Sequence, residues 1–352
     1  MIPLLVQGLS IEYRASQTVN KAVNAVSFSV DSGEVVGLVG ESGSGKSTAI
    51  LGVLGLTRRG GYITGGDVLI EGRSTTHLRE EEWRQVRGAR IGLITQNPRA
   101  SLNPVMRVGP QIMKVYQAHN KADNSEARAR ALSLLRAVGI NDPERRFFAF
   151  PHELSGGMAQ RAVIAMALSC SPRVLIADEP TSGLDVTIRA QVLDDLRRVV
   201  SSSGSSLLLV TQDLGIVANY CDRVYMMHVG EIVEEAGVDA FFNTPAHPAT
   251  AALMAAHLKE LRPRLALRGF PIDGRRLPSG CWLHPRCPFA EAADGCFERH
   301  PPPYEVEPGH WSRCHRYREV IAVGQDQLQP GEQDRGFSSD APDLLPSHHV
   351  EN

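Results

Sequence analysis

The chain has 352 residues, 42% of them hydrophobic and 22% charged, an ordinary globular composition that excludes disorder of the whole chain. Its 37 Lys and Arg residues against 39 Asp and Glu give a net charge of -2, so we expect no global attraction to nucleic acid or to an anionic membrane. No apolar run reaches the roughly 18 to 20 residues of a membrane-spanning helix, and Met1 to Ser10 lacks the features of a signal peptide. We therefore expect a cytosolic protein.

Short β-rich runs alternate with longer helical patterns in the first two-thirds of the chain, which is typical of an α/β fold with a largely parallel central sheet. The predicted strands are Val35–Val39, Ile91–Thr95, Val174–Ala177 and Leu207–Val210. Between Pro98 and Leu168 the β-rich runs stop and helical patterns follow, as in Glu126–Ala137 and Gly157–Leu168. We interpret this stretch as an inserted helical subdomain, at about residues 98–168.

A predicted hairpin, Arg223–Met227 and Glu231–Glu234 around Gly230, closes the first domain near residue 240. Residues 241–322 form the next predicted region. Within it, residues 263–308 are rich in Pro, Arg and Cys and too irregular for a hydrophobic core of their own. The remaining residues, 323–352, are polar with Pro and Ser, and we expect a disordered tail there.

A phosphate-binding motif, G-x-x-x-x-G-K-S/T, spans Gly40–Ser47, directly after the apolar run Val35–Val39 and before the helical pattern Thr48–Leu56. Its glycines let backbone N–H groups turn toward a phosphate at a helix N-terminus, while the lysine adds charge and the serine hydroxyl can ligate Mg²⁺. A chance match in this length has a probability on the order of one in a hundred. The motif predicts a nucleotide site that includes Gly40, Ser42, Gly43, Gly45, Lys46, Ser47 and Thr48.

Two carboxylates, Asp178 and Glu179, follow the apolar run Arg173–Ala177. A carboxylate at a strand end can hold Mg²⁺ through water, and the next one can orient the attacking water or accept its proton. An isolated Asp-Glu pair is more often a solvated surface pair, but the preceding buried run and the phosphate motif favour a catalytic role. We assign Asp178 to Mg²⁺ binding and Glu179 to catalysis.

Between these motifs, Leu154–Arg161 resembles the signature sequence of ATP-binding cassette (ABC) ATPases. Gln96 resembles the Q-loop glutamine of that family, Asp185 its D-loop aspartate, and Tyr13 its adenine-stacking aromatic residue, although an ordinary strand tyrosine is an equal alternative. The resemblance spans residues 1 to about 320 and implies a P-loop NTPase with a RecA-like core, an antiparallel β subdomain and a helical subdomain. It further implies ATP and Mg²⁺ as ligands, Gln96 in catalysis and Mg²⁺ coordination, and nucleotide contacts from Asp185, Ser155, Gly156 and Gly157.

Three segments resemble the ATPases of oligopeptide, dipeptide and nickel importers: Gln96–Pro104, Thr244–Pro248 and the cysteine-containing block Gly280–Cys314. This resemblance implies an ATPase that powers import of peptides or a related polar solute at the cytoplasmic face of the inner membrane. The implied partners are a second ABC ATPase, two transmembrane permease subunits and, indirectly, an extracytoplasmic solute-binding protein. The two ATPases pair head to tail, so each phosphate motif faces the signature of the other.

One residue departs from the family pattern. After the strand Leu207–Val210 the family has Thr-His-Asp, whose histidine contacts the γ-phosphate and the attacking water, whereas this chain has Gln212 in the histidine position. Glutamine donates a hydrogen bond but carries neither the positive charge of an imidazolium nor a transferable proton. We expect slow hydrolysis at this site, which favours a heterodimer, with adequate substitution by Gln212 as the alternative.

Two other classes of function compete with transport. A soluble ABC ATPase acting on nucleic acid or ribosomes usually has two cassettes or a long coiled coil, and this chain has neither. A catalytically silent nucleotide sensor is favoured in part by Gln212 but disfavoured by the retention of Lys46, Asp178 and Glu179. Copurification with membrane subunits separates these classes.

Four cysteines, Cys281, Cys287, Cys296 and Cys314, crowd into the irregular C-terminal region. Four thiolates can bind Zn²⁺ or an iron–sulfur cluster, and either would stabilise a segment without its own core. The resemblance to the importer block, whose members can carry a [4Fe–4S] cluster, favours the cluster over zinc. His284, His310 and His315 are spare ligand candidates, while Cys170 and Cys221 are interpreted as small buried hydrophobic residues.

Overall fold

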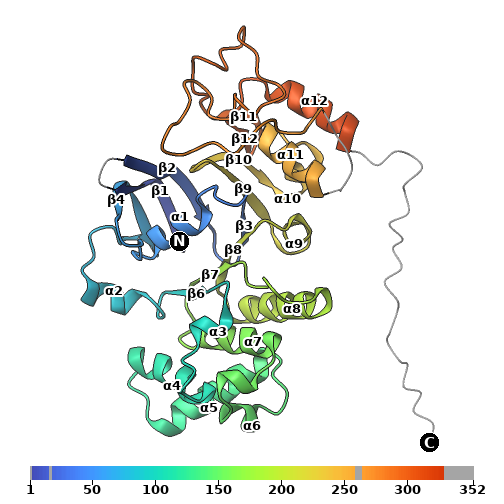
Figure 1. Cartoon of the computed structure of the whole chain (residues 1–352). Helices are drawn as coiled ribbons and strands as arrows, with labels where there is room; N and C mark the ends of the chain where they lie inside the picture. Colours follow the sequence, from blue (N-terminus) through green and yellow to red (C-terminus); the bar gives the residue numbers. More distant parts are fainter. Residues whose placement is uncertain (1, 16–17, 258–263, 329–352) are drawn as a thin grey trace, which may run out of the picture.

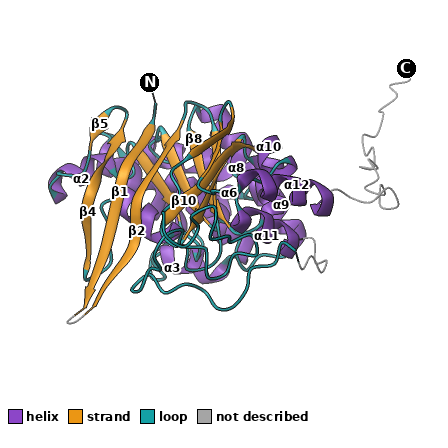
Figure 2. Ribbon diagram, turned by 90° about the horizontal axis from the view of Figure 1, so that it is seen from above, coloured by secondary structure: helices purple, strands orange, loops and turns teal. Residues whose placement is uncertain are grey.

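The computed structural model describes residues 2–15, 18–257 and 264–328 (Figure 1). In these ranges no helix combines the length and the apolar character that crossing a membrane requires. Two β-sheets and the helices packed on them form the body of the molecule. Figure 2 shows the N-terminal sheet on one side and most of the later helices on the other.

An eight-stranded sheet forms the centre, in the order β11-β12-β10-β9-β3-β8-β7-β6. Its strands are β3 (Val35–Val39), β6 (Ile91–Ile94), β7 (Val174–Asp178), β8 (Ser206–Thr211), β9 (Arg223–His228), β10 (Glu231–Gly237), β11 (Tyr304–Glu307) and β12 (His310–Ser312). The five strands β6, β7, β8, β3 and β9 run parallel. Strands β3 and β8 are buried along their whole length, as expected for parallel strands covered on both faces. The predicted α/β class and all four predicted central strands are confirmed.

A second, antiparallel sheet lies beside the first, with strand order β2-β1-β4-β5. Its strands are β1 (Leu4–Ala15), β2 (Thr18–Val30), β4 (Gly61–Ile70) and β5 (Arg73–Ser74), and α2 (Glu80–Val86) follows them. Helix α1 (Lys46–Val53) packs between the two sheets, because its Ile50 and Val53 belong to a core that also contains Leu9 of β1 and Leu208 of β8. This packing fixes the helix that begins at the phosphate motif.

A group of helices lies at the opposite end of the molecule from the C-terminal region (Figure 1). They are α3 (Pro98–Ser101), α4 (Val108–His119), α5 (Asn124–Ala137), α6 (Pro143–Phe147), a 3₁₀ turn (Pro151–Glu153) and α7 (Gly156–Ala167). Asp123 caps α5 by accepting the N–H of Glu126, which satisfies a free donor of the first turn. These helices occupy the range expected for the helical insertion.

Helices α8 (Val186–Ser203) and α9 (Leu214–Tyr220) alternate with the central strands. Helix α8 ends at Gly204, whose φ of 66° is the left-handed conformation that stops a helix and favours glycine. Asp213 caps α9 through the N–H groups of Gly215 and Ile216 and also pairs with Arg189 of α8 at 2.8 Å. The residue before this cap, Gln212, is thereby held at the carboxyl end of β8.

The C-terminal region is joined to the central sheet. It contains α10 (Val238–Asn243), α11 (Pro248–His257) and α12 (Tyr317–Leu328), and its strand β12 pairs with β10. Buried Glu234 of β10 accepts the backbone N–H groups of Ala246 and His247 and bonds to His310 Nε2 of β12 at 2.9 Å. The sheet therefore continues across the boundary that the sequence predicts near residue 240.

The expected disorder of residues 323–352 is wrong for residues 323–328, because they continue α12. Val320 of this helix packs with Ala251, Ala255, Leu265 and Cys314 in a small core of the C-terminal region. Helix α12 thus has an apolar face to bury, which a polar average composition conceals. Residues 329–352 lie outside the described part of the chain.

Candidate functional site

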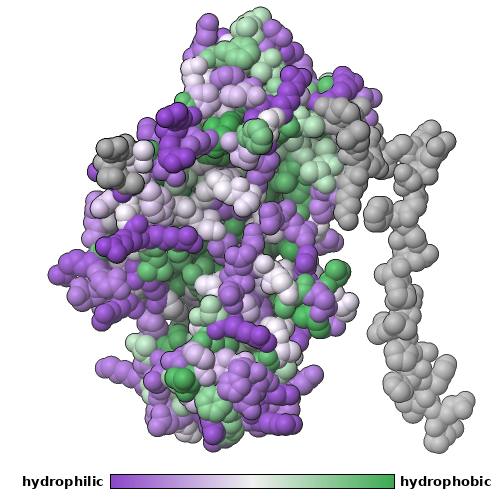
Figure 3. Space-filling model, in the orientation of Figure 1, coloured by the Kyte–Doolittle hydropathy of each residue, from purple (hydrophilic) through white to green (hydrophobic). Residues whose placement is uncertain are grey.

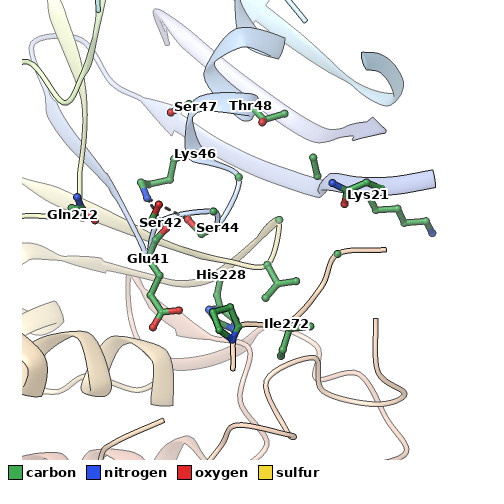
Figure 4. Close-up of a pocket in the computed structure, with 18 of the residues that line it drawn as sticks. Lys21, Glu41, Ser42, Ser44, Lys46, Ser47, Thr48, Gln212, His228 and Ile272 are labelled. Carbon is green, nitrogen blue, oxygen red and sulfur yellow. Dashed lines mark hydrogen bonds between the residues drawn. The ribbon is translucent and has the colours of Figure 1, made fainter. Parts of the chain in front are cut away.

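A cavity of about 500 Å³ opens around the phosphate motif (Figure 4), a volume within the range of small-molecule sites. Residues from many parts of the chain line it: the loop before α1 and the first turn of that helix, strands β1 and β2, the ends of β6, β7, β8 and β9, and the C-terminal region. Most predicted phosphate-binding residues line it, as do Tyr13, Gln96, Glu179 and Gln212.

The phosphate motif forms a tight loop between β3 and α1. Gly40 and Gly45 have φ values of 154° and 105°, and a Cβ atom would lie 2.2 Å from Met227 O at the first and 2.6 Å from Ala22 O at the second. Larger residues are therefore excluded by neighbouring backbone. Lys46 is 7% exposed, and its Nζ donates to the carbonyls of Gly40 at 2.7 Å and Glu41 at 2.9 Å.

The ammonium group of Lys46 is buried close to three carboxylates. Burial lowers its pKa, whereas the nearby carboxylates of Glu179, Asp178 and Glu41 raise it. Two backbone carbonyls accept its hydrogen bonds, and a phosphate oxygen is a stronger, charged acceptor for the same ammonium group. The loop is thus arranged to exchange internal hydrogen bonds for contacts with an anion.

Asp178 ends β7 beside the first turn of α1. Ser47 Oγ donates to Asp178 Oδ1 at 3.5 Å, so the two predicted Mg²⁺ ligands are neighbours. Burial raises the pKa of Asp178, while the Ser47 hydrogen bond and the Lys46 charge lower it. A bound divalent cation would likewise stabilise the ionised carboxylate.

Glu179, the next residue, bonds to the predicted Q-loop residue. Gln96 Nε2 donates to Glu179 Oε2 at 2.8 Å across 83 positions of sequence. Glu179 has a φ of 44°, a strained value for a non-glycine residue, and its N–H is held by Val210 O at 2.9 Å. Gln212 lines the same cavity and, with Glu179, a second hollow that reaches Asp213 and Arg189.

Tyr13 of β1 also lines this cavity. Its ring packs so closely over Gly61 that a Cβ atom there would lie 2.8 Å from Tyr13 Cε1. An aromatic ring on the cavity wall can stack on a planar base.

The signature residues lie outside the cavity. Ser155 caps α7 by accepting the N–H of Met158 at 3.3 Å, and Asp185 caps α8 by accepting the N–H of Ile188 at 3.0 Å. Gly157 approaches α8 so closely that a Cβ atom would lie 2.6 Å from Ile188 Cγ2. The structure thus joins Ser155, Gly156, Gly157 and Asp185 into one helix-terminus cluster, apart from the residues around Lys46.

Comparison with known proteins identifies this arrangement. The "ABC transporter" family model matches residues 23–182, and the model "Oligopeptide/dipeptide transporter, C-terminal region" matches residues 233–296. The dipeptide transport ATP-binding protein DppD of Escherichia coli is 41% identical over 318 residues, which cover 90% of this chain and 97% of DppD. The chain belongs to the ABC transporter family. The oligopeptide transport ATP-binding protein AppD of Bacillus subtilis is 42% identical over 302 residues, covering 85% and 92% of the two chains.

A solved ABC structure has the same cassette fold. The dimeric, post-hydrolysis ATP-binding cassette MJ0796, bound to ADP and Pi, superposes with a TM-score of 0.60 at 26% identity and covers 67% of this chain and 98% of its own. Membership of the family confirms the P-loop fold and the ATPase activity coupled to transport that the motifs predict.

The four C-terminal cysteines of this ABC protein line one small cavity. Burial raises the pKa of Cys281 to about 11 and that of Cys287 to about 12, and it raises the pKa of Cys314 as well. The N–H of Phe289 donates to Cys287 Sγ at 3.3 Å. Within the described ranges, no three His, Cys, Asp or Glu side chains are arranged to hold a metal ion.

Several residues that line the nucleotide cavity belong to none of the sequence motifs. Arg286 and the loop containing Pro271, Ile272 and Gly274 come from the C-terminal region, and His228 comes from the end of β9. Burial and the charge of Arg286 lower the pKa of His228 to about 4, against an opposing effect of Glu41. Among these residues, only Arg286 has a sequence feature that draws attention to it, because it lies between Cys281 and Cys287.

Proposed function

We propose that this chain binds and hydrolyses ATP to power the import of peptides or a related polar solute at the cytoplasmic face of the inner membrane. The observation that carries the proposal is a cavity that gathers Gln96, Glu179 and Gln212 from three strand ends beside Lys46 at the start of α1. The C-terminal family match and relatives named for peptide transport support the solute class.

In this proposal, each group of residues around the cavity has a specific role in binding or hydrolysing ATP. The phosphates bind the loop Gly40–Ser47, Thr48 supports them from α1, and Tyr13 stacks on adenine. Ser47, Gln96 and Asp178 would hold Mg²⁺, which would supply positive charge to the phosphoryl group. Glu179 would orient the attacking water, and its carboxylate accepts a hydrogen bond from Gln96 Nε2 at 2.8 Å.

A second ABC ATPase completes the site. Because Ser155, Gly156, Gly157 and Asp185 lie at helix termini outside their own cavity, they are free to contact nucleotide in the cavity of a partner. The N-terminus of α7 carries a partial positive charge that suits an incoming γ-phosphate. Closure of a head-to-tail pair would then make ATP the link between the two subunits.

Two permease subunits dock on the helical end, and a solute-binding protein acts through them. Val105 is 81% exposed and Phe148 is 45% exposed, and Arg107 lies 5.7 Å from the centroid of the Phe148 ring. Val105 and Arg107 directly follow the segment Gln96–Pro104, which begins with the predicted catalytic glutamine. On the face shown in Figure 3, apolar side chains emerge among polar ones over this helical end.

Reconstitution tests the transport function. When the chain is coexpressed with its permeases and ATPase partner, we expect a membrane complex that takes up peptide into proteoliposomes only with MgATP. The same coexpression separates the alternatives. A chain that hydrolyses ATP but does not copurify with the coexpressed membrane subunits would contradict transport and favour a soluble ABC ATPase. Uptake of another polar solute instead of peptide would revise the solute class alone.

We further propose that the ATPase pair is an asymmetric heterodimer. Gln212 lines the cavity near Glu179 but supplies no positive charge to the reacting phosphate, so this chain's own site hydrolyses slowly. Its signature cluster still serves the active site of its partner. Turnover of complexes in which one ATPase at a time is disabled by a Glu→Gln change measures the asymmetry.

We propose that Cys281, Cys287, Cys296 and Cys314 hold a [4Fe–4S] cluster. Their convergence on one cavity and the N–H donated to Cys287 Sγ fit a thiolate-bound cluster. A tetrahedral zinc site draws its four sulfurs close to one ion, whereas a cluster spreads them over several irons. The group would supply stability to a region with a small core.

Metal analysis of anaerobically purified protein tests the cluster. We expect about four iron atoms per chain and a broad visible absorbance, both lost in Cys314→Ser, because Cys314 is buried among the other three thiols. Cys170→Ser is the matched control, since Cys170 lies in the ATPase core outside this cavity. A measured content of one zinc atom per chain would contradict the cluster and indicate a zinc site. A protein without any bound metal would contradict both.

A further inference from the structure

Arg286 links the cysteine-containing block to the phosphate loop. It lies directly before Cys287, is only 9% exposed, and its Nη1 donates to Glu41 Oε2 at 3.0 Å across 245 positions of sequence. Glu41 is the second residue of the phosphate motif. A charge from the far end of the chain therefore sits against the loop that holds Lys46.

Hydrogen bonds to Arg268 hold the backbone and the guanidinium group of Arg286 in place. Arg286 Nε donates to Arg268 O at 3.3 Å, and the N–H of Arg268 donates to Arg286 O at 2.8 Å. The N–H of Arg286 donates in turn to Leu283 O at 2.9 Å, which closes a turn between Cys281 and Cys287. Arg286 is thus a fixed support of the site.

The same segment forms one wall of the nucleotide cavity. Pro271, Ile272 and Gly274 line it together with Arg286, and Gly274 lies so near β2 that a Cβ atom would be 2.7 Å from Asn20 Oδ1. Figure 4 shows Ile272 and His228 beneath the phosphate loop, on the side toward which the Glu41 side chain points. We name residues 268–287 the wall segment.

The ion pair between Arg286 and Glu41 affects the charge that an anionic ligand meets in the cavity. The Glu41 carbonyl accepts from Lys46 Nζ at 2.9 Å, and Glu41 lines the cavity that would receive the phosphates. An unpaired carboxylate there would repel a nucleotide, because like charges at short range are unfavourable in a partly desolvated site. Arg286 neutralises this carboxylate and keeps it turned away from Lys46.

We propose that Arg286 is a positioning residue of the nucleotide site: it neutralises Glu41 and docks the wall segment on the phosphate loop, so that ATP binding and the order of the wall segment are coupled. The inference rests on the proposed ATP site. Coupling of this kind is reciprocal, so ATP orders the segment to the extent that the segment strengthens ATP binding. The C-terminal region is therefore part of the nucleotide site.

ATP titration of the purified full-length chain tests the electrostatic part. Arg286→Gln is expected to weaken ATP binding about fivefold, the scale of one partly screened charge near a charged ligand. Arg286→Lys keeps the charge and should bind nearly as the wild type does. Arg275→Gln is the matched control: Arg275 lies in the wall segment but pairs with Asp273 at the surface and does not line the cavity, so we expect no change.

A double variant separates charge from general damage. Because Arg286→Gln leaves the Glu41 carboxylate unpaired, adding Glu41→Gln should recover most of the lost affinity instead of weakening binding further. If the two changes add, or if Arg286→Gln binds ATP as the wild type does, the electrostatic role of Arg286 is wrong.

Hydrogen exchange tests the coupling to the wall segment. In the wild type, MgATP is expected to slow amide exchange across residues 268–287 at least about threefold, and Arg286→Gln should lose this added protection. ATP binding without any change in the segment, or protection that persists in Arg286→Gln, would overturn the coupling. Absence of ATP binding in the wild type would overturn the proposed ATP site together with this inference.

Discussion

Replacing Gln212 with histidine is expected to raise ATP turnover at this chain's own site about 10²- to 10³-fold. Removing a single positioned hydrogen-bond donor to a developing negative charge typically lowers turnover by this factor, so we expect a gain of the same size when such a donor is added. Gln212 lines the cavity beside Glu179, and the cap formed by Asp213 at the start of α9 fixes the backbone next to it. An imidazole at this position can therefore reach the region where the phosphates bind, and it can carry a positive charge.

The measurement requires the two sites of the ATPase pair to be read separately. In a complex whose partner carries its catalytic Glu→Gln change, the remaining turnover belongs to this chain, and Gln212→His should raise it. Gln212→Asn is the matched control, because it shortens the side chain without adding a charge, and no gain is expected. In the otherwise wild-type complex, Glu179→Gln should leave most turnover intact.

Two outcomes would contradict this account. If Gln212→His brings no gain, the glutamine substitutes adequately and the asymmetry has no basis in this residue. If Glu179→Gln abolishes turnover of the wild-type complex as completely as the partner's change does, both sites are required for hydrolysis. Either result would leave ATP binding and transport untouched while removing the proposed inequality between the subunits.

Replacing Lys46 with alanine is expected to weaken ATP binding about 10²-fold or more. Removing one partner of a buried, charge-assisted interaction typically costs several kcal/mol, and the lost lysine would have contacted the β- and γ-phosphates. Lys46 is 7% exposed and already held between the Gly40 and Glu41 carbonyls, so little ordering remains for it when a phosphate arrives. Titration with ATP measures the loss directly.

Lys21→Ala is the matched control for Lys46→Ala. Lys21 is an exposed lysine on β2 that lines the same cavity away from the phosphate loop (Figure 4), so its loss should change affinity less than about threefold. A second readout is thermal unfolding: ATP at a hundred times the wild-type dissociation constant should stabilise the wild type by about 2.7 kcal/mol, but Lys46→Ala by only about 0.4 kcal/mol or less. Equal stabilisation of both proteins would place the nucleotide elsewhere.

Motifs made of neighbouring residues could be predicted without the structure. The phosphate loop needs a strand, glycines and a helix start within one short stretch, so Gly40–Ser47 carries its own context. The same holds for Asp178 and Glu179 after a buried strand, and for the Ser155 cap at the start of α7. The alternation of apolar strands with helical patterns likewise determined the α/β class, because burial on both faces demands continuous apolar runs.

Contacts between distant residues required the tertiary structure. Nothing local indicates that Arg286 meets Glu41, that Gln96 bonds to Glu179, or that β12 extends the central sheet beside β10. The polar average of the final residues likewise concealed the last turns of α12, residues 323–328. The sequence by itself determined which chemistry this chain carries, since each motif is a short run with its own backbone geometry. Only the fold decided that the C-terminal region forms a wall of the nucleotide site, because pairing across 245 positions depends on which surfaces are left to bury once the central sheet has formed.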